Sequence, residues 1–251
     1  MQGIAMSPAV LRDGEVMTHI VLNAAMLVPL ISDEPDEEAR AMAVGIIAHE
    51  CGHVQVTADK ERAVPDLRLG TRIDDYERGI MFQLAEVAWD EYAACRLSAP
   101  FAKGQDLMHA VTVATAAATA RERSNAAIRA YRRHYDLHRL VAEAGLALAT
   151  PLKAAAYLLG GMDAEEEAWD KHPEARAALD TGGYGDLVDR MHAELRSLWD
   201  SRASWKPTLD IFRGVEDVAR DMFRSGGIHF RRNGTNGWRI DVPFTPDTMP
   251  T

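Results

Sequence analysis

The sequence predicts an α+β protein that is mainly α-helical. An Ala-rich tract over 105–149 is nearly free of helix breakers, and glycine pairs separate further helical segments after it. Short stretches of alternating apolar and polar residues near both ends of the chain favour small sheets. Because 47% of the 251 residues are hydrophobic, the chain can bury a substantial core, and we expect a globular protein.

The first predicted element is a β-strand over 16–22, which reads Val-Met-Thr-His-Ile-Val-Leu and is followed by an apolar segment that ends at Pro29. Such a strand can border a substrate cleft. We expect a helix next, from about Pro35 to Thr57. Residues 32–38 favour its start, because they supply a capping side chain, a proline for the first turn and carboxylates near the positive end of the helix dipole.

This predicted helix contains an HExxH motif, His49-Glu50-Cys51-Gly52-His53. Residues four apart lie one above the other on a helix, so His49 and His53 can direct two imidazoles at one metal ion. Both lie on an apolar stripe that should face inward, and Glu50 would then sit beside the metal. The alternative is a pair of core histidines bonded to backbone carbonyls, which leaves Glu50 without a role.

A second predicted helix, over 77–99, offers Glu86, Asp90 and Glu91 as a third metal ligand. The neighbours of Glu91 three and four positions away are all apolar, whereas Glu86 lies on a mixed face. Because an unpaired buried carboxylate is costly, we predict Glu91 as the ligand, with Glu86 as the alternative. Without a metal, Glu91 would pair with an arginine such as Arg96. With Glu91 as a metal ligand, Asp90 or Glu86 would instead hold the second nitrogen of a metal-bound histidine.

With these residues the chain resembles the Glu-zincin metallopeptidases, in which a Glu on a later helix completes HExxH. Within that group it is most similar to the ImmA/IrrE-type family of bacterial and phage proteins. The resemblance covers about residues 14–100 and rests on 48–53 together with 91–100, which reads Glu-Tyr-Ala-Ala-Cys-Arg-Leu-Ser-Ala-Pro. It implies a zincin-like core with a small N-terminal sheet. It also implies Zn²⁺ as cofactor, with His49, His53 and Glu91 as ligands and Glu50 as the general base.

The function predicted from this motif is hydrolysis of peptide bonds by a zinc metallopeptidase. Zinc held by three protein ligands lowers the pKa of its water to about 7, and Glu50 would take the water proton. Tyr131, His134 or Tyr135 would stabilise the oxyanion, and nothing in the sequence selects one. A peptide or protein is the expected substrate. The alternative function is a catalytically inactive zincin-like scaffold that acts as a protein-interaction or regulatory module.

The rest of the chain is predicted to be helical up to a terminal β-hairpin. Loop residues such as Pro65 and Gly70 favour a connection over 58–77, and the tract over 105–149 fits one very long helix or two consecutive ones, ended by Pro151. Further helices are expected at 152–160, 163–180, 184–203 and 210–224. A hairpin is expected over 228–232 and 238–242, around a loop at 233–237. The predicted parts are a metal-binding core (1–100), a helical extension (101–227) and a hairpin and tail (228–251), as separate units or as one domain.

Charge and composition limit the partners that we expect. A net charge of −10 and a pI near 5.4 give no overall attraction to nucleic acid or anionic lipid, so neither is predicted as a partner. The apolar tract over 140–161 is interrupted by Glu143, Pro151 and Lys153, which argues against a membrane span. With two cysteines and no secretory signal pattern, a cytoplasmic location is expected. His134 and His138 are four apart without a nearby carboxylate, a pattern typical of ordinary helices.

Overall fold

The computed structural model describes residues 4–33, 36–64, 67, 69, 73–234 and 237–249. Its α-helices are α1 (Ala24–Ile31), α2 (Glu37–Ala63), α3 (Tyr76–Ser98), α4 (Gln105–His134), α5 (Leu137–Ala164), α6 (Pro173–Thr181), α7 (Gly185–Ser201) and α8 (Arg213–Ser225). Its 3-10 helices are η2 (Ala99–Phe101), η3 (Trp169–Lys171), η4 (Arg202–Ser204), η5 (Leu209–Phe212) and η6 (Pro246–Thr248). Its strands are β1 (Ala5–Met6), β2 (Ala9–Arg12), β3 (Glu15–Thr18), β4 (Val21–Leu22), β5 (His229–Asn233) and β6 (Gly237–Asp241). The chain is therefore mainly helical with small antiparallel sheets, as the sequence predicts.

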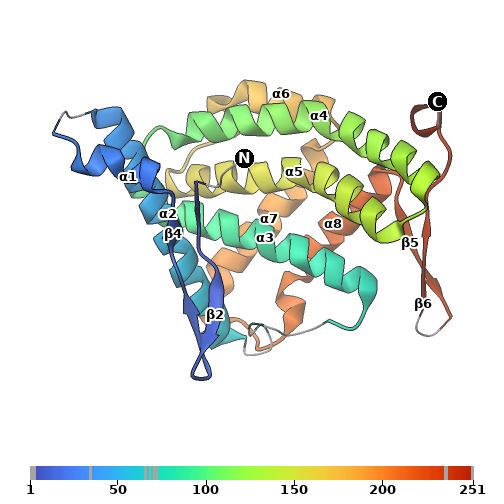
Figure 1. Ribbon diagram of the computed structural model, residues 1–251, viewed down its shortest axis with the longest axis horizontal. Helices are drawn as coiled ribbons and strands as arrows, with labels where there is room; N and C mark the ends of the chain where they lie inside the picture. The colour runs from blue at the N-terminus through green and yellow to red at the C-terminus, as the bar shows by residue number, and fades with distance from the viewer. Residues whose placement is uncertain are drawn as a thin grey trace.

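The helices pack around a central pair, α3 and α5 (Figure 1). α4 lies along one side of α5, α2 crosses α3 near one end of the molecule, and the β5–β6 hairpin lies at the other end. One hydrophobic cluster extends from Val56 on α2 to Ile228 before β5, with Tyr92, Leu148 and Leu158 fully buried near its middle. The division of the chain into three parts remains a prediction.

The N-terminal region forms two small antiparallel pairs, β1 with β4 and β2 with β3, so the strand predicted over 16–22 is present but interrupted at 19–20. Asp13 and Gly14 adopt positive φ angles of 52° and 84°, which close a two-residue turn between β2 and β3. The strand β3 ends at Thr18 and β4 resumes at Val21 in the same register, with the His19 amide donating to the Pro8 carbonyl between the two pairs. The apolar segment at Pro29 is the helix α1, which contains this proline.

The boundary between α4 and α5 lies at Tyr135 and Asp136, and the expectation that Pro151 ends a helix is wrong. Tyr135 has a left-handed φ of 56°, which stops α4, and the Asp136 carboxylate accepts from the Arg139 amide to start α5. Pro151 is buried inside α5, where packing on α3 and α4 outweighs the lost backbone hydrogen bond. The predicted helix over 152–160 is thus the second half of α5.

Other predicted boundaries differ in smaller ways. α2 continues six residues beyond Thr57 to Ala63 (63 − 57), so the predicted connection begins later. The predicted helix over 163–180 is instead the end of α5, η3 and then α6, because Pro173 starts a new helix at its first position. The terminal hairpin pairs Phe230 with Ile240, as predicted. The expected roles of Pro35, Pro65 and Gly70, and the part of the hairpin loop at 235–236, lie outside the described residues.

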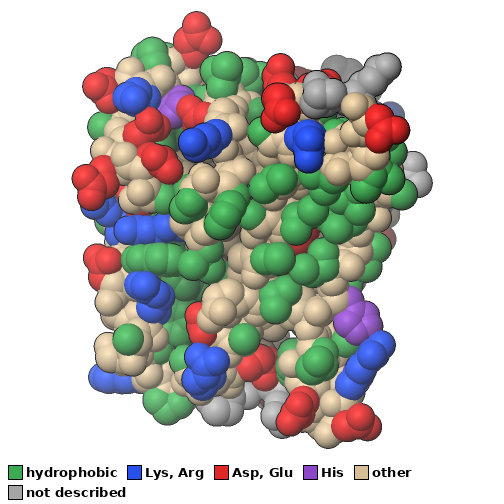
Figure 2. Space-filling view, turned by 90° about the vertical axis from the view of Figure 1, so that its left-hand side faces the viewer, with side chains coloured by type: hydrophobic (Ala, Val, Ile, Leu, Met, Phe, Trp, Pro, Cys, Tyr) green, Lys and Arg blue, Asp and Glu red, His purple; other side chains and the backbone are tan. Residues whose placement is uncertain are grey.

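The side of the molecule formed by α1 and α2 carries many hydrophobic side chains (Figure 2). Exposed apolar residues there include Val44 on α2, Leu97 at the end of α3 and Phe101 in η2, and they line a shallow groove with Ile47 and Cys51. Among the helices of the described residues, none combines the length and the apolar character needed to cross a membrane.

Candidate metal centre

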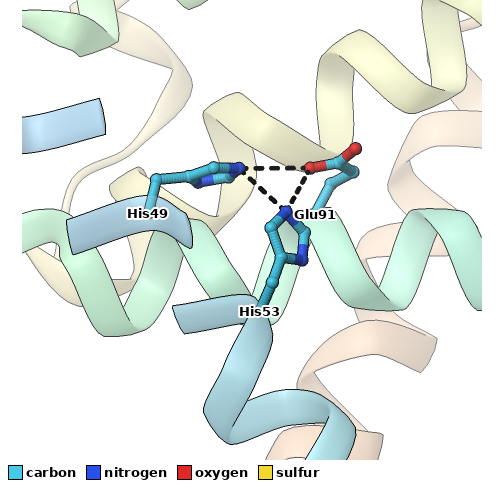
Figure 3. A group of neighbouring side chains, drawn as sticks. All are labelled: His49, His53 and Glu91. Atoms are coloured by element: carbon cyan, nitrogen blue, oxygen red, sulfur yellow. Dashed lines mark hydrogen bonds and ion pairs between the residues drawn. The ribbon is translucent and has the colours of Figure 1, made fainter. Parts of the chain in front are cut away.

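His49 and His53 project from α2 toward Glu91 on α3, and all three side chains meet where the two helices pack together (Figure 3). The close packing depends on Gly52, because a Cβ at this position would lie 2.9 Å from the Ala94 carbonyl oxygen. A glycine within HExxH therefore lets the backbone of α3 approach α2 closely enough for Glu91 to reach both histidines.

The three facing atoms form a small triangle. His49 Nε2 and His53 Nε2 lie 3.0 Å apart, and Glu91 Oε2 lies 3.4 Å from the first and 3.2 Å from the second. Ligands bound at about 2.1 Å in a tetrahedral zinc site are separated by about 3.4 Å, so these spacings match the size of one shared ion. The structure therefore brings together the three residues that were selected from the sequence. They could hold a metal ion.

The electrostatics of Glu91 suit a ligand. Burial alone would raise its pKa, but bonds from His49, His53 and Tyr157 outweigh that effect and, with the charge of Lys153, hold the pKa far below its usual range. Glu91 therefore stays anionic. Its Oε2 is buried and lacks a hydrogen-bond partner of good geometry, so this oxygen is available to a cation.

Glu50 lies next to this triangle and is buried, with 6% of its surface exposed. The Ser7 hydroxyl, just after β1, donates hydrogen bonds to Glu50 Oε2 and to the Glu50 backbone carbonyl. The negative charge of Glu50 contributes to raising the pKa of both His53 and Tyr157, although burial and Glu91 have larger effects on these groups. The carboxylate therefore faces the same space as the histidines.

Helix α5 supplies two further side chains that sequence reasoning missed. Lys153 Nζ lies 3.1 Å from Glu91 Oε1, and the Tyr157 ring stacks on His49 with centroids 5.5 Å apart and planes at 19°. Lys153 and Tyr157 are four residues apart, on one face of an otherwise apolar tract. These two polar residues, one helical turn apart in an apolar tract, were the sequence feature that could have predicted a site beside α5.

Cys95, one turn after Glu91 on α3, lies behind His49. Its Sγ is 3.6 Å from His49 Nδ1, the nitrogen that faces away from the triangle. Burial raises the pKa of the thiol, and the charge of Glu91 raises it further, so the group stays protonated. When Nε2 binds a metal, the Nδ1–H of His49 donates to this sulfur, and the weak bond orients the imidazole so that its Nε2 points at Glu91.

Glu86 and Asp90 lie on α3 near the centre but have a different partner. Lys60, buried on α2, places its Nζ 2.8 Å from Glu86 Oε1 and 2.7 Å from Asp90 Oδ1. Glu86, the alternative metal ligand, therefore pairs with the buried Lys60 instead. The suggested bond from Asp90 or Glu86 to a histidine nitrogen is replaced by this ion pair.

The residues proposed to stabilise an oxyanion lie far from the centre. His109 on α4 is near it, with its ring centroid 5.4 Å from that of Tyr157. His134 is 25 residues further along the same helix (134 − 109), a distance of about 37 Å at 1.5 Å per residue. Tyr131 packs against both His134 and Tyr135. His138 contacts Tyr76, at the opposite end of α3 from the centre.

Comparison with models of known protein families, with curated proteins and with solved structures found no match. The assignment of this site therefore depends on the geometry of its side chains.

Proposed function

We propose that this chain is a zinc-dependent metallopeptidase of the Glu-zincin type, similar to the ImmA/IrrE-type family. The observation that carries the proposal is the convergence of two imidazole nitrogens and one carboxylate oxygen within 3.4 Å of one another. In this proposal His49, His53 and Glu91 hold Zn²⁺. When bound, zinc supplies a Lewis acid that polarises the scissile carbonyl and makes water more acidic at neutral pH.

The donor set supports this choice of metal. Two imidazoles and one carboxylate are the ligands of catalytic zinc sites that keep a position open for substrate or water. A buried carboxylate oxygen without a good hydrogen-bond partner also fits a ligand better than it fits a closed hydrogen-bond network, because leaving such an atom unpaired is costly.

In the proposed mechanism Glu50 is the general base. Ser7 engages its Oε2, which fixes the orientation of the carboxylate and leaves Oε1 for the attacking water. Glu50 accepts a proton from that water and later passes it to the leaving amine, so one group serves both half-reactions. General acid–base catalysis of this kind contributes about 10²- to 10⁴-fold to rate.

Tyr157 is the proposed donor to the developing oxyanion. Burial raises the pKa of its phenol and the charge of Glu91 raises it further, so the hydroxyl keeps its proton at neutral pH. The hydroxyl bonds to Glu91 in this structure, and it would turn to the oxyanion once Glu91 binds the metal. Its stacking on His49 fixes the ring beside the centre. Lys153 holds the second oxygen of Glu91 and thereby orients this ligand.

Two cavities are lined in part by residues close to the centre and would take the side chains of a peptide. One, of about 250 Å³, includes Lys153 and is lined by apolar residues such as Val87 and Met222. The other, of about 330 Å³, is lined by Cys95, His109 and polar residues at the start of α4. A peptide with an apolar residue on one side of the scissile bond is therefore the proposed substrate.

The test compares Glu50→Gln with Glu86→Gln, which removes a carboxylate from the neighbouring ion pair. We expect Glu50→Gln to retain the zinc bound at this centre and to lose at least ~100-fold in cleavage of a mixed peptide library. Glu86→Gln should retain both zinc and cleavage. Full activity in Glu50→Gln, or wild-type protein that binds no zinc at the centre, would overturn the proposal.

A second candidate function is a metal-containing interaction module without hydrolytic activity. The observation that favours it is the apolar groove of Val44, Ile47, Leu97 and Phe101 on the exposed side of α2. Exposed apolar surface of this kind often marks a protein-interaction site. Zinc-replete protein that cleaves no peptide in the library would favour this function.

A further inference from the structure

A second group of metal-ligating side chains lies where α4 begins and α5 ends. Asp106 is in the first turn of α4, Glu167 follows the end of α5, and His172 immediately precedes α6. One ligand atom from each lies within 4.8 Å of the other two. Three segments that are separate in the sequence therefore bring two carboxylates and one imidazole to one place.

His172 is the observation that points to a ligand. Its side chain is 5% exposed, and its Nε2 has no hydrogen-bond partner. This nitrogen is 3.7 Å from Glu167 Oε2 and 4.0 Å from Asp106 Oδ2, distances too long for hydrogen bonds. A buried polar atom left without a partner is costly, and here it faces two carboxylate oxygens across a gap that one ion would fill.

The charges around this gap favour a cation. Lys171 Nζ lies 3.1 Å from Glu167 Oε1 and is largely exposed, so it engages one carboxylate oxygen and leaves Oε2 facing His172. The two carboxylates together outweigh this single lysine.

We propose that Asp106, Glu167 and His172 form a second divalent-cation site that takes a first-row transition-metal ion such as Zn²⁺ or Mn²⁺. One imidazole and two carboxylates are a donor set that suits these ions. The ligand spacings of 3.7 and 4.0 Å are wider than those at the centre of His49, His53 and Glu91, so binding must draw the segments slightly together. This site is therefore expected to bind more weakly than the first.

The second site lies on the wall of the larger cavity. Asp106 and Glu167 line it together with Cys95 and His109, the residues that border the first centre. Burial lowers the pKa of His109 to about 4, so this imidazole is neutral between the two sites at neutral pH. A cation held here would tie the start of α4 to the connection between α5 and α6, and would fix that wall of the cavity. This inference does not require the peptidase activity proposed above.

The experiment measures equilibrium Zn²⁺ binding to the full-length chain and to variants at each site. We expect two ions per wild-type chain, and one in His172→Gln and in Asp106→Asn, with at least a tenfold loss of affinity for the weaker ion. His134→Gln is the matched control, because its Nε2 is likewise buried and unpartnered but belongs to no metal-ligating group among the described residues. It should bind two ions.

Glu91→Gln separates the two sites. Glu91→Gln should retain one ion at the weaker site, and Glu91→Gln with His172→Gln should retain none. Wild-type protein that binds one ion, lost in Glu91→Gln and unchanged in His172→Gln, would overturn the second site and leave the proposed function intact. Asp106 is 44% exposed in its side chain, so Asp106→Asn tests the site even where His172→Gln fails to fold. In ¹⁵N-labelled wild-type protein, the His172 imidazole signals should shift when the second equivalent is added.

Discussion

Helices α2 and α3 meet at two polar places, and the two places balance charge differently. At the first, His49 and His53 on α2 face Glu91 on α3, and acceptor atoms converge without a cation of the protein between them. At the second, Lys60 lies seven residues after His53 on the same helix and faces Glu86 and Asp90 (60 − 53). There the protein itself supplies the cation.

The comparison identifies which carboxylates are available to a metal. Burial would lower the pKa of Lys60, but the charges of Asp90 and Glu86 outweigh burial and raise it, so the ammonium group stays charged. Both of its carboxylate partners are therefore already paired with a cation of the protein. Glu91 has Lys153 on one oxygen only, and its other oxygen faces the histidines. Two neighbouring clusters on one helix pair thus differ in charge balance, because Lys60 pairs with both carboxylates of its cluster, whereas Lys153 leaves free the Glu91 oxygen that faces the histidines.

The largest expected effect comes from giving the first cluster an internal cation as well. His53→Lys places an ammonium group near Glu91 and removes one imidazole, so Zn²⁺ affinity should fall by about 1,000-fold, or ~4 kcal/mol. Titration with zinc in the presence of a competing chelator measures the change. His53→Gln is the control that removes the ligand without adding charge. Near-normal affinity in His53→Lys would show that the ion does not bind at this triangle.

Removing the internal cation from the second cluster should affect stability and leave the metal unchanged. Lys60→Met leaves two carboxylates without their buried partner, and we expect a loss of about 3 kcal/mol in the free energy of unfolding. Urea unfolding measures it, and zinc per folded chain should equal that of wild type. Adding Asp90→Asn should restore part of the loss. A Lys60→Met protein that unfolds normally but no longer binds zinc would contradict the separation of the two clusters.

In a protein whose second site is removed by Asp106→Asn, metal removal should destabilise the chain only when the first cluster is intact. At a free zinc concentration 100 times the Kd, binding stabilises the folded state by about 2.7 kcal/mol. Chelation should therefore lower the free energy of unfolding of Asp106→Asn protein by that amount and leave Asp106→Asn with His53→Lys unchanged. Thermal unfolding with and without chelator checks this. Equal chelator effects on both proteins would mean that the stabilising ion binds elsewhere.

Local spacing made the first cluster predictable. His49 and His53 follow from a spacing of one helical turn, and the apolar neighbours of Glu91 indicated that its carboxylate is buried. The role of Lys60 was not predictable, because it depends on the packing register of α2 against α3. That register is set by contacts between residues distant in the sequence.

The same limit explains the missed side chains of α5 and the misplaced helix boundary. Tyr157 reaches His49 only because α5 packs on α3, where Gly160 lets it approach, since a Cβ there would lie 2.3 Å from the Tyr92 carbonyl oxygen. Pro151 normally predicts the end of a helix, but tertiary packing keeps it inside α5. The zincin-like core, the zinc and the hydrolytic activity remain predictions.

The smallest expected effect concerns a third polar cluster, around Asp163 on α5, which like Lys60 is neutralised by the protein's own groups. Its carboxylate is 6% exposed and accepts hydrogen bonds from Tyr92 and His192, with Arg96 at 3.6 Å. Burial would raise the pKa of Asp163, but the bonds from His192 and Tyr92 outweigh burial and lower it.

A lowered pKa in the folded state makes the contribution of Asp163 to stability dependent on pH. The contribution is complete above the unfolded value, near 3.8, and is lost as the pH falls through the folded value. Asp163→Asn should therefore cost about 1.5 kcal/mol at pH 7, and its difference from wild type should shrink below pH ~4. Urea unfolding at both pH values measures this difference, and zinc binding should not change. A difference that is independent of pH would mean that Asp163 acts through packing, and would remove it from the set of charges that the protein balances internally.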